Sequence, residues 1–102
     1  METNEQNQKE LRRYGREQIL EEGILQVGEE KQSVDILDVS VDAPDGIVRG
    51  FGILASTRLS QKQECLLHLP TTGYSGHYLC AAVYCQDTGF GYRAGLMVRK
   101  IM

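Results

Sequence analysis

The chain has 102 residues, of which 41% are hydrophobic and 25% are charged, a composition typical of one soluble globular domain. Its formal net charge of -3 argues against a general nucleic-acid binder, and no apolar run is long enough to span a membrane. The polar start is no secretory signal and three cysteines form no paired framework, so we expect a cytoplasmic protein.

The N-terminal segment predicts a flexible arm. Residues 1–10 are rich in Gln, Asn and Glu, and a group of arginines follows at Arg12, Arg13 and Arg16. Gly15 interrupts any helical turn at this point. We therefore divide the chain into an arm over residues 1–17 and a folded domain over residues 18–102.

The rest of the chain predicts six short strands joined by glycine-bearing turns. The apolar stretches that suggest them span residues 19–27, 34–42, 47–56, 64–69, 78–85 and 90–98. Within the first stretch, Gly23 suggests a bulge or a bend. Little helix is expected, so the fold class is all-β. A small antiparallel barrel is favoured over a sandwich because closure leaves no long exposed edge.

The second and third strands predict a hairpin that turns at residues 43–46. Proline suits the second position of a type I turn, and glycine accepts the left-handed conformation that follows. If residues 44–46 form a three-residue loop, Ala43 faces Ile47 and the register is fixed. It pairs Leu37 with Ile53, Val39 with Phe51, Val41 with Arg49, Asp38 with Gly52, and Ser40 with Gly50.

One face of this hairpin is then polar and open. Asp38 and Ser40 lie beside the two glycines, so a carboxylate and a hydroxyl have bare backbone opposite them. This arrangement suits a small polar ligand. The alternative is an ordinary strand pair whose polar face meets water.

The arginines of the arm suit an anionic nucleotide. Arg12 and Arg16 are four residues apart, with Arg13 between them. Guanidinium groups bind phosphate oxygens and the O6/N7 edge of guanine, and they stack on purine rings. The alternative is a solvated basic tail.

Cysteines and histidines have zinc-like local spacing in Cys65-x-x-His68 and His77-x-x-Cys80. A hairpin of the fourth and fifth strands would pair His68 with His77 and Cys65 with Cys80. Residues three apart on a strand point to opposite faces, so the four side chains cannot converge on one metal. Buried cysteines beside a pair of histidines are the expected arrangement.

No catalytic motif is present, and we do not expect an enzyme. The sequence has no Gly-x-Ser-x-Gly elbow, and its glycines do not precede a helix as those of a phosphate loop do. Its aromatic residues could stack bases on an open barrel face, but such residues more often fill cores and cap barrel ends.

Several segments together resemble the PilZ domain family. They are Arg12-Arg13-Tyr14-Gly15-Arg16, Asp38-Val39-Ser40, Gly50-Phe51-Gly52-Ile53 and Tyr92-Arg93-Ala94-Gly95-Leu96. The resemblance begins at Leu11 and covers nearly the whole remaining chain. It implies a six-stranded split barrel that acts as a receptor for the bacterial second messenger cyclic-di-GMP, with no other cofactor and no metal.

The resemblance also implies the ligand-binding residues. Arg12 and Arg16 match the family's arginine arm, with Arg13 between them, and Asp38 and Ser40 match the Asp/Asn-x-Ser-x-x-Gly motif. The last glycine of that motif falls on Ala43. Gly50 is the best substitute, after an insertion around residues 43–49.

The expected function is that of a non-catalytic receptor whose arm closes over the ligand and passes the signal to a partner protein. Neither nucleic acid nor membrane insertion is expected. The chain stops at Met102 without the C-terminal helix that family members usually carry. The alternative is a PilZ-like adaptor that binds proteins and no nucleotide, although such adaptors typically lack the arginine arm.

Overall fold

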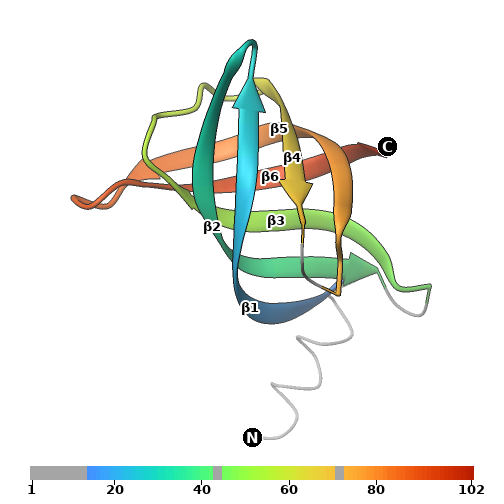
Figure 1. The fold of residues 1–102 in the computed structure, drawn as a ribbon. Coiled ribbons are helices and arrows are strands. Elements are labelled where there is room, and N and C mark those ends of the chain that lie inside the picture. The colour runs from blue at the N-terminus through green and yellow to red at the C-terminus, as the bar shows by residue number, and fades with distance from the viewer. Residues whose placement is uncertain (1–13, 43–44, 71–72) are drawn as a thin grey trace, which may run out of the picture.

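The computed structural model describes residues 14–42, 45–70 and 73–102. Six antiparallel strands close into a barrel in the order β1-β2-β3-β6-β5-β4, which confirms the predicted all-β fold class (Figure 1). The strands are β1 (Tyr14–Val27), β2 (Glu30–Asp42), β3 (Ile47–Ala55), β4 (Glu64–Leu69), β5 (Gly76–Asp87) and β6 (Tyr92–Ile101). Within these described ranges, no helix is long and apolar enough to cross a membrane.

The core fills the inside of the barrel with aliphatic side chains from all six strands. Because side chains alternate along a strand, every second residue faces inward. Phe51 and Tyr78 meet edge to face across the interior, with ring centroids 4.9 Å apart. The fully buried aliphatic side chains with the largest volumes are Leu25, Ile36, Ile53, Leu67, Leu69, Val34 and Val39.

Strand β1 begins at Tyr14, earlier than the expected start near Ile19. It pairs with β2 from Tyr14 opposite Asp42 onward, so the long β2 strand supplies backbone partners for these additional residues. Arg16 therefore lies on a strand, within the segment that the sequence assigned to an arm.

The bulge in β1 also differs from the prediction. Residues 19 and 20 form the bulge, since both lie opposite the single residue Leu37 where the register shifts between Gln18 and Glu21. Gly23 instead stays in register opposite Val34 and allows β4 to approach closely. A Cβ atom on Gly23 would lie 3.1 Å from the carbonyl oxygen of His68.

The hairpin register is confirmed at its centre. Asp38 pairs with Gly52, Val39 with Phe51, and Ser40 with Gly50. On either side of these pairs the prediction is wrong: Ile36 rather than Leu37 pairs with Ile53, and Val48 rather than Arg49 pairs with Val41.

Two β-bulges explain these errors, because Leu37 on β2 and Arg49 on β3 are each an extra residue. At the tip, Asp42 pairs with Ile47, and the Gly46 amide donates to the Asp42 carbonyl oxygen at 2.7 Å. Gly46 has a φ of 74°, so the predicted left-handed glycine is present. Ile47 therefore pairs with Asp42 and not with the predicted partner Ala43, which itself lies outside the described residues.

The fourth and fifth strands pair as predicted, with Cys65 opposite Cys80 and His68 opposite His77. The two imidazole rings stack with centroids 4.0 Å apart. Both cysteines are buried free thiols in the core, whereas the histidines lie on the more exposed face of the same strands. The thiols and imidazoles thus occupy opposite faces of the sheet.

Burial of the two core thiols makes the stability of the fold sensitive to alkaline pH. Desolvation raises the pKa of Cys65 to about 11, with a smaller effect from Glu64, and desolvation together with Cys65 raises that of Cys80 to about 12. An unfolded chain loses these protons near pH 9 while the folded chain keeps them. Stability is therefore complete below pH 9 and falls as the pH rises from 9 to 12.

We expect urea midpoints to be constant from pH 7 to 8.5 and to fall above pH 9. The Cys80 thiol contributes a slope of at most about 1.4 kcal/mol per pH unit. The variant Cys80→Ala should start less stable and show a shallower decline. An identical decline in both proteins would show that the Cys80 thiol does not cause the loss of stability. The slope that remains in Cys80→Ala comes from other groups, such as Tyr78, whose pKa is also raised, chiefly by burial.

Candidate functional site

The candidate site is a polar shelf on the outer face of the barrel. Backbone pairing sets five residues side by side across five strands, and all point outward from the core. They are Gln18 on β1, Asp38 on β2, Gly52 on β3, Gly95 on β6 and Tyr84 on β5. Because the two glycines are neighbours in this row, the floor of the shelf is bare backbone.

A second row runs beside the first, two residues away on β1, β2, β3 and β6 and three residues away on β5, where the register shifts. It pairs Arg16 with Ser40, Ser40 with Gly50, Gly50 with Met97, and Met97 with Ala81. The backbone register thus brings together three of the residues predicted for the ligand site, namely Arg16, Ser40 and Gly50. Asp38 precedes Ser40 by two residues and shares its face.

Asp38 lies directly over the bare backbone of Gly52. A Cβ atom on Gly52 would be 2.6 Å from Oδ1 and 3.0 Å from Oδ2 of this carboxylate. The Asp38 side chain is only 13% exposed, and Arg93 Nη2 lies 3.9 Å from its Oδ2. Glycine at position 52 is therefore what permits an almost buried carboxylate on the outside of the barrel.

Tyr84 covers the neighbouring glycine in the same way. The tyrosine ring lies over Gly95, and a Cβ atom there would be 2.8 Å from the ring atom Cδ2. The residue is 42% exposed, so one flat surface of an aromatic ring faces solvent next to the carboxylate. Such a surface can stack on a planar base.

The predicted arginines differ in whether and where the structure places them. Arg12 and Arg13 lie outside the described residues, so their place relative to Asp38 stays a prediction. Arg16 is placed by its backbone opposite Ser40. Arg49, at the bulge, pairs with Asp42 at 2.9 Å and does not face the shelf.

The described residues of the lengthened hairpin remain paired within the sheet beside the shelf. Beyond Ser40, β2 remains paired with β1 on one edge and with β3 on the other, as far as Asp42. The described residues of the insertion therefore continue the sheet. Pairing of β3 with β6 ends at Gly50 and Met97, beyond which β6 continues along β5 as far as Ile101.

Sequence reasoning missed the contributions of Arg93, Gly95 and Tyr84 to the site. The resemblance includes Arg93 and Gly95 only as part of the last strand, and no sequence pattern assigns a role to Tyr84. A signal existed in the Arg93-Ala94-Gly95 alternation, which sets an exposed cation two residues from a bare position on the same face.

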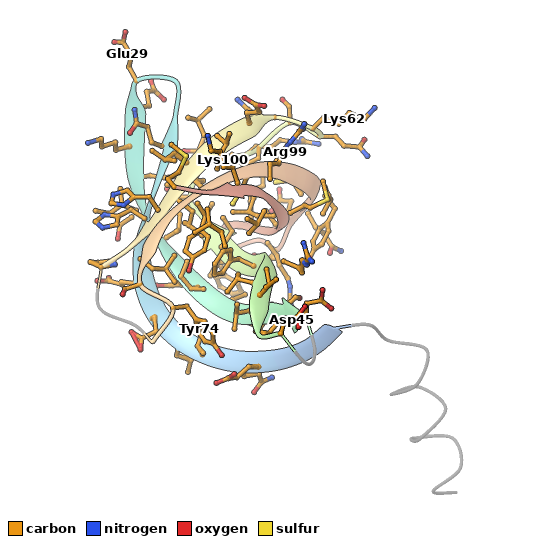
Figure 2. All side chains as sticks on the ribbon, turned by 90° about the vertical axis from the view of Figure 1, so that its right-hand side faces the viewer. Glu29, Asp45, Lys62, Tyr74, Arg99 and Lys100 are labelled. Atoms are coloured by element: carbon orange, nitrogen blue, oxygen red, sulfur yellow. The ribbon has the colours of Figure 1, made fainter. Side chains whose placement is uncertain are left out.

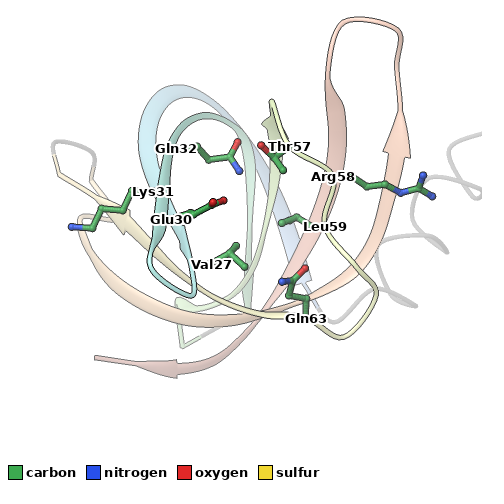
Figure 3. A pocket seen from close by; sticks show the side chains of 8 residues that line it. All are labelled: Val27, Glu30, Lys31, Gln32, Thr57, Arg58, Leu59 and Gln63. Carbon is green, nitrogen blue, oxygen red and sulfur yellow. The ribbon is translucent and has the colours of Figure 1, made fainter.

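A separate cavity of about 240 Å³ lies between the β1–β2 turn and residues 57–63. Figure 3 shows Lys31 and Arg58 pointing away from its centre and Glu30 pointing toward it. Gln32 is already engaged, because its Oε1 accepts bonds from the Ser56 amide and hydroxyl at 3.0 Å each. None of the predicted ligand-binding residues lines this cavity, and its hydrogen bonds serve to anchor the loop after β3.

The side chains on the shelf are suited to binding a ligand. It offers a carboxylate acceptor at Asp38, a hydroxyl at Ser40, a guanidinium at Arg93 and an aromatic surface at Tyr84. Among the described residues, no three metal-binding side chains gather into a group that could hold an ion. Hydrogen-bond acceptors and cations on a glycine floor suit a flat, polar and anionic ligand.

Comparisons with family models, with curated proteins and with solved structures found no match to this chain.

Proposed function

We propose that the protein is a cytoplasmic bacterial receptor for cyclic-di-GMP, of the kind formed by PilZ domains. The observation that supports this most is the Asp38 carboxylate lying over bare Gly52, with Ser40 opposite Gly50 and Arg16 opposite Ser40. These are the residue types and neighbours that the resemblance implies. The proposal assigns no catalytic step.

Each group on the shelf has a role in this proposal. Asp38 accepts hydrogen bonds from the N1–H and N2–H groups of guanine, an edge that adenine lacks. Arg16 binds the O6/N7 edge or a phosphate, together with Arg12 and Arg13. Ser40 donates its hydroxyl to a phosphate oxygen.

The two residues found in the structure extend the proposed site. Arg93 is 46% exposed and lies 3.9 Å from Asp38, so its guanidinium orients the carboxylate and adds positive charge for a dianionic ligand. Tyr84 offers its exposed ring face for stacking against the guanine held by Asp38.

Calorimetric titration with cyclic-di-GMP tests the proposal. We expect heat of binding for the wild type, and a loss of affinity of about tenfold or more in Arg16→Ala and Asp38→Ala, because each removes charge-assisted hydrogen bonds. Arg49→Ala is the matched control, since Arg49 pairs with Asp42 and not with the shelf. Cyclic-di-AMP should bind much more weakly than cyclic-di-GMP.

The same titration distinguishes the alternative function. Absence of heat with the wild type, or unchanged affinity in both shelf variants, would contradict nucleotide recognition. Amide NMR spectra that are identical with and without nucleotide would then favour the protein-interaction adaptor.

A further inference from the structure

A second surface of interest is a groove on the outer face of β5 and β6, with a volume of about 330 Å³. Its floor is apolar and consists of Ala81, Val83 and Met97, while Lys62 and Arg99 also line it. Val83 is 45% exposed and Met97 is 48% exposed.

The groove has a clear origin in the backbone. Ala81 pairs with Met97, and the small alanine leaves space beside the longer side chain. The register of β5 shifts between Ala82 and Tyr84, so Val83 is an extra residue, and its exposed side chain adds to the apolar floor. Gln61 and Lys62 form a wall beside it, because Lys62 N donates to Ala82 O at 2.7 Å and Ala82 N donates to Gln63 O at 2.9 Å.

Lys62 is held in an unfavourable backbone conformation. Its φ of 68° makes it the one non-glycine residue with a positive φ in the described part of the chain. A side chain in this region costs about 1–2 kcal/mol, which glycine would avoid. The hydrogen bonds to β5 maintain the conformation, and a lysine at this position points to a use for its ammonium group.

The two cations of the groove have no acidic partner within the protein's described segments. Neither Lys62 nor Arg99 lies within 4.0 Å of a carboxylate there, and Figure 2 shows both on the same side of the barrel. Glu64 on β4 lies opposite Ala81 on β5, but it forms no ion pair with Lys62 or Arg99. The groove is thus locally positive on a protein whose net charge is -3.

We propose that this groove docks a segment of a partner protein that carries an aliphatic side chain flanked by carboxylates. The aliphatic side chain would occupy the space among Ala81, Val83 and Met97, where methionine adapts to different shapes. The carboxylates would pair with Lys62 and Arg99. Two cations are too few for a nucleic-acid surface, which is broadly basic.

The size of the groove sets the expected strength of this contact. Its volume lies at the low end of the range of about 300–1,000 Å³ found for small-molecule pockets, so it holds one or two side chains. We therefore expect a transient contact with a dissociation constant on the order of micromolar.

The test is an NMR titration of the isotope-labelled full chain, without nucleotide, so its outcome does not depend on the proposed receptor function. The probes are a synthetic acidic peptide that alternates Asp or Glu with Leu, and a control peptide with Lys at each acidic position. We expect the acidic peptide to shift the amide signals of Lys62, Val83, Met97 and Arg99. The basic peptide should leave them in place.

Three variants make the test specific. Lys62→Gly removes both the ammonium group and the unfavourable φ, so it should melt at a higher temperature yet bind the acidic peptide about fivefold more weakly, equivalent to about 1 kcal/mol. Glu64→Gln should bind it more tightly. Arg58→Glu, a charge reversal outside the groove, should bind like the wild type.

Several results would overturn the proposal. They are the absence of shifts at a peptide concentration of about 1 mM, shifts located elsewhere on the barrel, and equal binding of the basic peptide. Binding of single-stranded DNA at the same residues would identify the groove as a nucleic-acid contact instead.

Discussion

Alanine at Gly50 is expected to lower the free energy of unfolding by about 1–3 kcal/mol. A Cβ atom at this position would lie 2.7 Å from the carbonyl oxygen of Leu96. That oxygen belongs to the backbone of β6, so it cannot rotate away as a side chain would. The β3–β6 pairing must therefore open slightly at its last pair, Gly50 with Met97.

Urea denaturation of the wild type and Gly50→Ala measures this effect. Gly73→Ala is the matched control, because a Cβ atom on Gly73 meets nothing within 4 Å and its φ is not in the left-handed region. The control should stay within about 0.5 kcal/mol of the wild type. Equal stability of the Gly50 variant and this control would show that the β3–β6 contact relaxes without cost.

Alanine at Gly52 is expected to abolish most nucleotide binding while costing less stability than alanine at Gly50. The new Cβ atom would be 2.6 Å from Asp38 Oδ1, so the carboxylate has to leave the shelf. A side chain can rotate toward solvent, which keeps the stability cost small. The Asp38 carboxylate is still present in the variant but no longer lies on the shelf to accept hydrogen bonds. The affinity for the nucleotide should therefore fall about tenfold or more.

Calorimetry with cyclic-di-GMP and urea denaturation should be run on the same Gly52→Ala preparation. Asp38→Asn is the companion variant, because it keeps the shape of the side chain and removes its charge. Wild-type affinity in Gly52→Ala would show that Asp38 does not contact the ligand from its position on the shelf.

Local sequence patterns predict the fold well because they act over short distances. Alternating apolar residues define the strands, and the glycine at position 46 ends the hairpin turn where the chain needs a positive φ. The predicted pairs of Asp38 with Gly52 and Ser40 with Gly50 are present because the bulge at Arg49 compensates for a loop that is one residue longer than predicted, since Asp42 rather than Ala43 pairs with Ile47. The site residues on this hairpin were therefore identified from sequence, whereas the length of its loop was not.

The remaining groups of the site depend on contacts between distant segments. Arg93 reaches Asp38, and Tyr84 covers Gly95, only because β6 pairs with both β3 and β5. No local pattern states which strands become neighbours in a barrel. The bulges at Leu37 and Arg49 were missed for a related reason, since the pairing on both sides of a strand decides where an extra residue is tolerated.

The bulge at Arg49 has a consequence for how this protein can diversify. It separates the paired segment that holds Asp38 and Ser40 from the outer end of the hairpin, whose described residues do not pair with β6. Residues can be gained or lost at that outer end without turning Asp38 inward, because its pairs with Gln18 on β1 and with Gly52 on β3 hold the register of the shelf. We therefore expect the hairpin tip to tolerate insertions that the three pairs beneath it would not.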